Sequence, residues 1–313
     1  MLITGAAGNL GGHLARSLLG AGMRLRLMVH RTPLDAEIAG APGVEPVEAD
    51  LAYTDSLRRA CRGVDTVVHF AGKLFAPGPE KFLPRTNTLW AHNLIQAALD
   101  EGTARFVLVS FPHVEGPSDP EHPARGRLDA EPVSVHAQTR LAAEHLLFDA
   151  CRHGDMQPVV LRSGMVYGRG VLMIDAGRRL LARRLLGVWR RPTWIHLISL
   201  TDFLAACRAA IERPALSGIF NLGDEQPTTL QAFADRAARH WGLARPWRAP
   251  RWAFFAAAWL VECFAKIFGT RAPLTVDFVR IGMVSYVMDT ARTRSVLLPE
   301  LRYPTLEQGI ESM

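Results

Sequence analysis

The 313-residue sequence has few cysteines and almost no lysine. Its four cysteines are Cys61, Cys151, Cys207 and Cys263. They lie far apart, without a CxxC pair or a metal-ligand Cys/His spacing, so we expect neither a disulfide framework nor a metal site. No basic stretch or cleavage site precedes the first apolar segment, so we expect no secretory signal and a cytoplasmic protein.

The positive charge comes almost wholly from arginine. The net charge is +6, and the only lysines are Lys73, Lys81 and Lys266. The arginines are scattered over expected helices and loops without aromatic side chains between them, which argues against a nucleic-acid partner. One arginine-rich segment contains Arg178, Arg179, Arg183 and Arg184. These side chains could hold a phosphate or carboxylate of a substrate, but the sequence favours the exposed face of a helix.

Long hydrophobic runs are also missing. The apolar stretch 252–268, WAFFAAAWLVECFAKIF, contains Glu262 and Lys266 and is shorter than the roughly 20 residues that span a bilayer. The sequence predicts a helix that is buried in the C-terminal part or covers a substrate pocket. A helix on a membrane surface is the alternative, because basic residues flank the stretch: Arg245, Arg248, Arg251 and Arg271.

Short apolar runs alternate with helical periods in the first half of the chain. The runs are MLIT, RLRLMV, VEPVEA, DTVVHF, RFVLVS and PVVLR, separated by helical segments such as 10–21, 54–61, 84–100 and 135–152. Continuous apolar strands joined by helices predict an α/β fold with a doubly wound parallel sheet. We expect this sheet domain over 1–162 plus about 195–222, with WIHLISL as a strand. A smaller, mainly helical lobe is expected over 163–194 and 223–313.

Three glycines stand between the first expected strand and the first expected helix, in LITGAAGNLGGHLARSLL. Gly5 permits a tight turn, Gly8 lets the backbone approach a pyrophosphate, and Gly11 allows close packing of the helix. The helix N-terminus would face the phosphate charge. This strand–turn–helix context predicts a dinucleotide-binding domain, and a purely structural glycine turn is the alternative.

The end of the second strand indicates which dinucleotide binds. Sites that bind NAD usually carry an acidic residue there, which holds the ribose 2′-hydroxyl. This chain has His30 and Arg31 instead. Because arginine pairs well with a 2′-phosphate, the sequence favours NADP; NAD, with Arg31 exposed and unliganded, is the alternative.

An ordered set of motifs supports this fold. It comprises the glycine turn, EADLAYTDSL with Asp50, VDTVVHFAG with His69 and Gly72, TNTLWAHNLIQAA with Asn87, and VVLRSGMVYGRG with Arg162, Tyr167 and Gly168. With these motifs the chain resembles the extended short-chain dehydrogenase/reductase superfamily, NAD-dependent epimerase/dehydratase type, whose nucleotide domain is a Rossmann sheet. The C-terminal segments FNLGDEQPTTLQAFAD and VMDTARTRSVLLPELRYPTLEQGI look like the branch containing 3β-hydroxysteroid dehydrogenase-like proteins.

Together with the glycine turn and Arg31, the resemblance implies a set of cofactor residues. They are Gly5, Ala7, Gly8, Asn9, Leu10, Gly11, Arg31, Asp50, Leu51, Phe70, Ala71, Gly72, Asn87 and Arg140. Asp50 and Leu51 would lie against the adenine, and Asn87 near the nicotinamide. The resemblance also implies that the lobe after Arg162 binds substrate, and that the chain forms a homodimer through helices of the nucleotide domain.

The catalytic pair of this superfamily is replaced in this sequence. Members carry Tyr-x-x-x-Lys on the helix after the fifth strand, and HAQTRLAAE places His136 and Arg140 at those positions. An imidazole titrates near neutral pH and could exchange a proton with substrate, whereas an arginine could bind ribose but not relay a proton. The candidate hydroxyl is Ser110, one residue before its usual place, where Phe111 stands.

These residues predict an NADP-dependent oxidoreductase or epimerase-like enzyme that acts on a hydroxyl or ketone carbon of a small molecule, hydrophobic or anionic. In it, His136 is the acid/base, Arg140 the ribose and charge partner, and Ser110 a donor to the substrate oxygen. An equal alternative is that His136 faces the cofactor but takes no part in catalysis. The chain would then be a catalytically silent NAD(P)(H)-binding sensor or scaffold, or a non-redox enzyme on the same fold.

Overall fold

The computed structural model describes residues 1–72, 78–213, 215–270 and 274–313, so Lys73 and Arg271 lie outside the described residues. Its centre is a seven-stranded sheet in the order β11-β6-β5-β4-β1-β2-β3, in which all neighbouring strands are parallel. The strands are β1 (Leu2–Thr4), β2 (Leu25–Val29), β3 (Val44–Glu48), β4 (Thr66–His69), β5 (Arg105–Ser110), β6 (Gln157–Ser163) and β11 (Gly218–Leu222). The strand order reverses between β1 and β4, where sheets of this kind bind ligands beyond the carboxyl ends of the strands.

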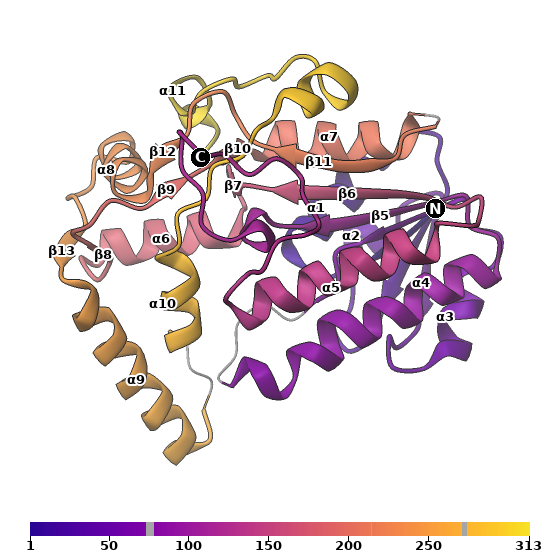
Figure 1. The fold of residues 1–313 in the computed structure, drawn as a ribbon, viewed down its shortest axis with the longest axis horizontal. Coiled ribbons are helices and arrows are strands. Elements are labelled where there is room, and N and C mark those ends of the chain that lie inside the picture. Colours follow the sequence, from indigo (N-terminus) through magenta and orange to yellow (C-terminus); the bar gives the residue numbers. More distant parts are fainter. Residues whose placement is uncertain (73–77, 214, 271–273) are drawn as a thin grey trace.

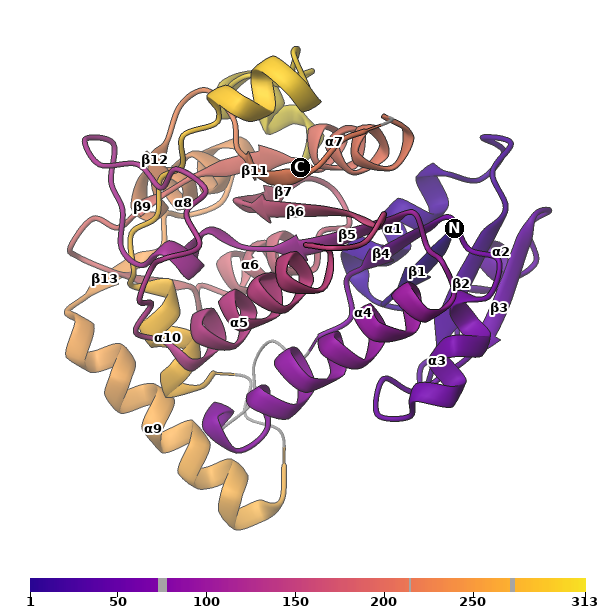
Figure 2. The ribbon, with the colours of Figure 1, turned by 45° about the vertical axis from the view of Figure 1, so that its right-hand side comes forward.

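Helices cover both faces of this sheet (Figure 1, Figure 2). On one face α3 (Thr54–Cys61), α4 (Trp90–Asp100) and α5 (Val135–Ala150) pack side by side. On the other face α1 (Asn9–Ser17) contacts α7 (Leu200–Glu212), and the short α2 (Ala36–Ala39) precedes β3. The expected doubly wound α/β fold is confirmed.

The two faces of the sheet bury separate hydrophobic clusters, because side chains alternate along each strand. In β4, Val67 packs toward α3 and α4, whereas Val68 packs toward α1 and α7. Phe106 and Val107 of β5 divide in the same way. All four side chains are fully buried. Packing on both faces therefore holds the carboxyl ends of β1, β4 and β5 in place.

The C-terminal part forms a smaller lobe, as expected, but it contains short strands as well as helices. Its helices are α6 (Leu172–Ala182), α8 (Leu230–His240), α9 (Arg251–Phe268), α10 (Val276–Gly282) and α11 (Leu306–Gly309). Short two-stranded sheets join β7 (Met165–Tyr167) to β10 (Leu197–Ser199), β9 (Trp194–Ile195) to β12 (Thr228–Thr229), and β8 (Gly187–Trp189) to β13 (Trp247–Ala249). The predicted strand WIHLISL is interrupted at His196, whose buried ring bonds the backbones of Asp224 and Met288. The two-domain division stays a prediction.

Helix α9 differs from what the sequence predicts. Of its side chains, all described, only Ala258 and Ala265 are buried, so the expectation of a helix buried in the lobe is wrong. The helix extends away from the body of the molecule, next to α10 (Figure 1, Figure 2). Hydrophobicity alone predicted burial, but most of the large side chains of this helix are exposed. Within the described residues, no helix is long and apolar enough to cross a membrane.

Candidate active site

The glycine turn lies between β1 and α1. Gly5 has a φ of +74°, and a Cβ at this position would lie 2.9 Å from the backbone nitrogen of Ala71. A Cβ on Gly11 would lie 2.3 Å from the carbonyl oxygen of Gly5. The amide of Gly8 bonds the same oxygen at 2.8 Å, and within the described residues no side chain caps the first turn of α1. The N–H groups at the start of α1 that no side chain caps can donate hydrogen bonds to an anionic pyrophosphate.

The segment after β4 runs beside this turn. The hydroxyl oxygen of Thr4 lies 2.7 Å from Nδ1 of His69 and accepts a hydrogen bond from the amide of Ala71. Phe70 packs edge-on against Phe203 of α7. Burial, with a smaller contribution from the Arg140 charge, lowers the pKa of His69 to about 3, so this imidazole is neutral at physiological pH. It braces the segment rather than exchanging protons.

The predicted adenine side contains a pair of residues from two strands. Oδ2 of Asp50 lies 3.2 Å from Nε2 of His30, and its Oδ1 accepts a bond from the amide of Ala52. Leu51 is buried, whereas Arg31 is exposed at the end of β2. In the sequence, His30 and Arg31 stand together where NAD-binding sites usually carry an acidic residue. In the structure, His30 has Asp50 as a separate partner.

Asn9, the first residue of α1, is already engaged through its side chain. Its amide nitrogen donates to the carbonyl of Gly170 at 2.7 Å, and its amide oxygen accepts from the backbone nitrogen of Leu172 at 2.9 Å. These bonds tie α1 to the start of α6. Any contact of Asn9 with a cofactor would therefore come from its backbone.

Gly72, Asn87 and Arg140 meet at one corner of the cleft. A Cβ on Gly72 would lie 2.9 Å from Nη2 of Arg140 and 3.6 Å from Oδ1 of Asn87. Burial lowers the pKa of the Arg140 guanidinium, and the carboxylate of Glu144 opposes this shift. Among the described residues, Nε and Nη1 of Arg140 are buried without a hydrogen-bond partner. Buried donors of this kind need an acceptor, so the corner fits a ligand rich in hydroxyl or phosphate oxygens.

His136 forms an ion pair that the sequence did not indicate. Its Nδ1 lies 2.7 Å from Oδ2 of Asp277, with 3% and 11% of the two side chains exposed. Ser134 caps the start of α5 by accepting a bond from the amide of Ala137, which sets His136 in the first turn. Thr275 caps α10 in the same way, so Asp277 falls in its first turn. In the sequence this aspartate looks like an ordinary helix-start acid, and no local signal links it to His136.

Ser110 belongs to a buried polar network. Its hydroxyl donates to Oε1 of Glu144, and Nη2 of Arg162 lies 2.6 Å from Oε2 of the same carboxylate. Arg162 also pairs with Glu115, which accepts bonds from the amides of Arg125 and Gly126. The sequence places Ser110 against a substrate oxygen, but in the structure its proton goes to Glu144. A bond to substrate would require an exchange of this partner.

The loop after β5 contains the histidines that the motifs did not explain. Phe111 and Tyr286 pack on either side of His113, with ring centroids 5.3 and 4.5 Å away, and burial lowers the pKa of His113 to about 4. His122 is exposed beside Asp119. Over the described ranges, no cluster of three His, Cys, Asp or Glu side chains could hold a metal.

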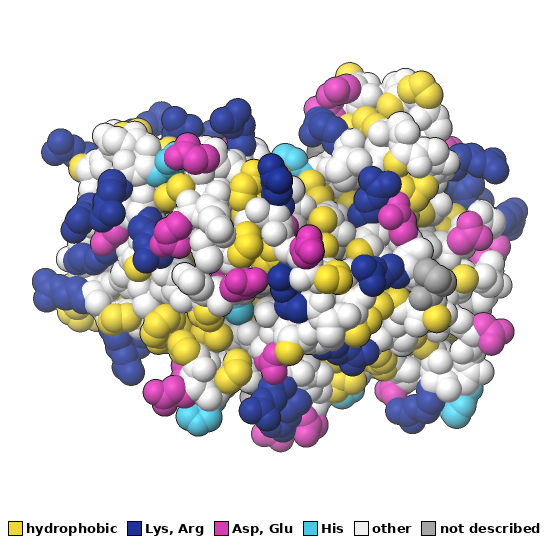
Figure 3. Space-filling view, turned by 90° about the horizontal axis from the view of Figure 1, so that it is seen from above, with side chains coloured by type: hydrophobic (Ala, Val, Ile, Leu, Met, Phe, Trp, Pro, Cys, Tyr) yellow, Lys and Arg dark blue, Asp and Glu magenta, His cyan; other side chains and the backbone are white. Residues whose placement is uncertain are grey.

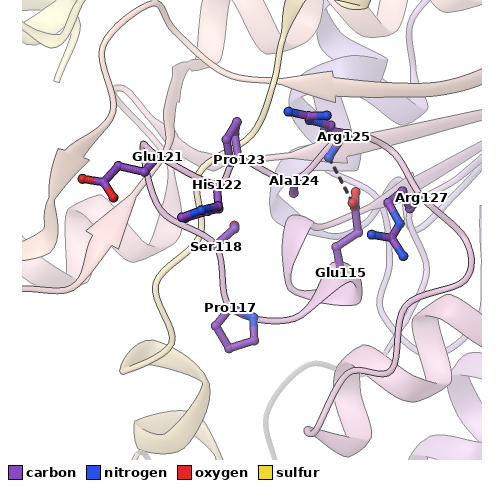
Figure 4. Close-up of a pocket in the computed structure, with 9 residues that line it drawn as sticks. All are labelled: Glu115, Pro117, Ser118, Glu121, His122, Pro123, Ala124, Arg125 and Arg127. Carbon is purple, nitrogen blue, oxygen red and sulfur yellow. Dashed lines mark hydrogen bonds between the residues drawn. The ribbon is translucent and has the colours of Figure 1, made fainter.

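A cavity of about 340 Å³ lies beside this network, lined by Glu115, 117–118, 121–125 and Arg127 (Figure 4). Figure 4 shows the hydrogen bond that the Arg125 amide donates to Glu115, between two residues that line the cavity. Neither His136 nor Arg140 lines this cavity. It is therefore separate from the glycine turn and from the start of α5.

Comparison with known proteins identifies relatives of the whole arrangement. The model of the NAD-dependent epimerase/dehydratase family matches residues 1–223. Ceramide reductase of Caulobacter vibrioides is 32% identical over 228 residues, which are 71% of this chain and 63% of that protein. The 3 beta-hydroxysteroid dehydrogenase type 7 of Mus musculus is 30% identical over 186 residues, 54% of this chain and 50% of that protein. The chain thus matches between half and two thirds of the length of these relatives.

A solved structure extends the similarity over the full chain. The structure of MoeE5 in complex with UDP-glucuronic acid and NAD has a TM-score of 0.77 at 23% identity, and the match covers 100% of this chain and 96% of that one. At this identity the likeness establishes the fold, including the Rossmann sheet and the smaller lobe.

Proposed function

The chain belongs to the NAD-dependent epimerase/dehydratase family, and we propose that it is an NADP-dependent oxidoreductase acting on a hydroxyl or ketone carbon of an apolar small molecule. The single observation that carries the proposal is the 2.7 Å contact between His136 and Asp277, at the position that the sequence pattern assigns to the family's catalytic tyrosine. The names of the two curated relatives, a ceramide reductase and a steroid dehydrogenase, favour a lipid-like substrate.

The cofactor residues fit a nicotinamide dinucleotide. When bound, such a cofactor supplies hydride transfer to or from the substrate carbon. The turn at Gly5 and Gly8 and the N-terminus of α1 hold the pyrophosphate. Arg140 donates its unpaired Nε and Nη1 protons to cofactor oxygens beside Gly72. Exposed Arg31 pairs with the 2′-phosphate, which makes NADP the preferred cofactor and NAD the weaker one.

The His136 imidazole exchanges the proton that accompanies hydride transfer. Asp277 lies against Nδ1 of the ring and orients it, and the imidazole exchanges this proton with the substrate oxygen. The carboxylate also stabilises the positive charge that forms when the ring takes up a proton. Arg140 cannot perform this exchange, because a guanidinium stays protonated in proteins.

Ser110 has a supporting role in this proposal. Its hydroxyl fixes Glu144, whose carboxylate is shared with Arg162 and acts electrostatically on Arg140. Two arginines and two glutamates, Arg140, Arg162, Glu115 and Glu144, thus balance their charges in the protein interior. Because buried charges are costly unless paired, this balance keeps Arg140 in place for the cofactor.

Purified protein with NADPH and two ketones, a long-chain 3-ketosphingoid base and a 3-ketosteroid in detergent micelles, tests the proposal. We expect nucleotide oxidation that disappears in His136→Ala, while NADPH still binds that variant. Turnover that survives the substitution would remove His136 from the mechanism. Binding of NADPH without turnover of any ketone would favour the silent sensor or scaffold. A homodimer remains part of the proposal.

A further inference from the structure

Helix α9 presents large apolar side chains to the surroundings. The exposed fractions are 71% for Trp252, 60% for Trp259, 60% for Leu260, 57% for Phe264, 76% for Ile267 and 63% for Phe268. With 3.6 residues per turn, these positions fall on one half of the helix circumference. Scattered exposed apolar residues are normal on proteins, but a contiguous face of this kind marks an interaction surface.

The polarity of α9 is the reverse of that of a surface helix in water, which buries its apolar side. Here the buried residues are the small Ala258 and Ala265, and Phe254 packs against Trp189 and Trp247. The carboxylate of Glu262 accepts a bond of 2.9 Å from the amide of Val276 at the start of α10. The helix is therefore attached to the lobe by this bond and by the Phe254 contacts, while the large apolar side chains of its other face are exposed.

Exposed arginines flank β8, whose partner strand β13 directly precedes α9. Trp247 of β13 stacks on Phe254 of α9, and the amide of Arg190 bonds the carbonyl of Ala249, so β8, β13 and α9 are neighbours. The exposed arginines that precede and follow β8 are Arg178, Arg179, Arg183, Arg184, Arg190 and Arg191. In Figure 3, Lys and Arg side chains gather at the left-hand end, where Figure 1 shows α6, α8 and β8.

These arginines carry uncompensated charge. Within the described ranges, none of the six forms an ion pair with a carboxylate. A second copy of the chain placed on α9 would bring two such groups together and add repulsion. Phosphate headgroups supply the opposite charge, and interfacial Trp side chains suit the boundary between headgroups and acyl chains.

We propose that α9 lies flat in the headgroup region of an anionic phospholipid bilayer. Its apolar face enters the acyl boundary, and the arginines around β8 contact lipid phosphates. The 18 residues of α9 make a helix about 27 Å long. Two tryptophans, Trp252 and Trp259, are placed to anchor it at the interface.

The docking surface is connected to the candidate active site. α10 packs on α9 and carries Asp277, the partner of His136. A bilayer-bound α9 would therefore hold this site next to the membrane, where an apolar ketone is concentrated. This consequence for the substrate rests on the proposed function, whereas bilayer binding itself does not.

Vesicle flotation tests the docking surface without any activity measurement. The full chain is mixed with vesicles of phosphatidylcholine alone, or of equal parts phosphatidylcholine and phosphatidylglycerol. We expect flotation with the anionic vesicles, weakened by added salt, and a bound fraction about tenfold lower in Ile267→Glu and in the Arg179→Glu/Arg183→Glu double variant. Val296→Glu is the matched control, since Val296 is exposed on another surface, and it should float like the parent protein.

Circular dichroism and thermal unfolding establish that each variant is folded. A folded parent chain that does not float with anionic vesicles would overturn the proposal, as would an Ile267→Glu variant that floats unchanged. A dimer in gel filtration that Ile267→Glu converts to a monomer, without vesicle binding, would assign the face to a second copy. Vesicle binding without ketone turnover would leave the docking surface intact and contradict only the proposed reaction.

Discussion

Nδ1 of His136 and Oδ2 of Asp277 lie 2.7 Å apart, although the two residues are far apart in the sequence. His136 is fixed by the start of α5, next to the Rossmann sheet, and Asp277 by the start of α10. The pair therefore joins the starts of two helices that are far apart in the sequence. A carboxylate this close orients the imidazole, which suits the acid/base role that we propose for it.

Asp277→Asn should lower kcat by about a hundredfold, because an amide holds the ring in the wrong tautomer and stabilises no positive charge. The dissociation constant of NADPH should hardly change, since Asp277 contacts His136 and not the glycine turn. Steady-state kinetics and calorimetric titration measure the two quantities. Asp119→Asn, an exposed aspartate, is the control and should retain full kcat. An unchanged kcat in Asp277→Asn would separate the ion pair from catalysis.

Arg140→Ala should weaken NADPH binding by about tenfold or more, because it removes charge-assisted donors from the cofactor corner. Arg140→Lys should recover only part of the affinity, since an ammonium lacks the planar fork of the guanidinium. Arg152→Ala removes a surface ion pair with Asp149 and provides the control. Equal NADPH affinity in all three variants would show that Arg140 is a structural residue.

Arg31→Ala should weaken binding of NADP by about tenfold and leave that of NAD unchanged, because only NADP carries the 2′-phosphate. The comparison requires titrations of both nucleotides against both proteins. If the parent protein bound NAD as tightly as NADP, and the variant changed neither affinity, the cofactor assignment would be incorrect.

Gly11→Ala should lower the free energy of unfolding by about 1–3 kcal/mol and abolish dinucleotide binding. The added Cβ would lie 2.3 Å from the carbonyl oxygen of Gly5, and neither backbone can move without opening the turn. Gly177→Ala in α6 is the matched control, since a Cβ there meets nothing within 4 Å. That helical glycine should be replaced at no cost, or with a gain of up to about 1 kcal/mol. Urea unfolding of both variants decides between the outcomes.

Asp224 makes stability depend on pH. Burial raises the pKa of this carboxyl to about 8 from an ordinary value of 3.8. Between these values the folded chain binds a proton that the unfolded chain has lost, so the free energy of unfolding falls as the pH rises. Asp224→Asn should match the parent protein near pH 4 and be the more stable protein at pH 8, by urea unfolding. A difference that does not depend on pH would contradict the shifted pKa.

The sheet and the glycine turn were predictable because their signals are local. Runs such as DTVVHF alternate with helical segments, and β4 lies where that run predicts it, at Thr66–His69. The conformation of Gly5 follows from the tight turn that joins a strand to a helix. The placement of His136 and Arg140 at the family's tyrosine and lysine positions rests on the RLAAE pattern and stays a prediction.

The other parts of the candidate site could not be predicted, because they depend on contacts between segments that are distant in the sequence. Nothing near Asp277 in the sequence indicates that its carboxylate meets His136. The bond from Ser110 to Glu144 likewise depends on how α5 packs on β5. For α9, composition predicted a hydrophobic helix correctly but not its direction, because burial is decided by neighbouring elements. Hydrophobicity could not show which side chains of α9 are exposed and which are buried.

A crystal structure of the protein with bound NADP tests the central claim most directly. The account predicts the pyrophosphate over Gly5 and Gly8, a cofactor oxygen within hydrogen-bond distance of Nε or Nη1 of Arg140, and the nicotinamide in the same cleft as His136. A nicotinamide bound elsewhere, or an Arg140 guanidinium that still lacks an acceptor in the complex, would contradict it.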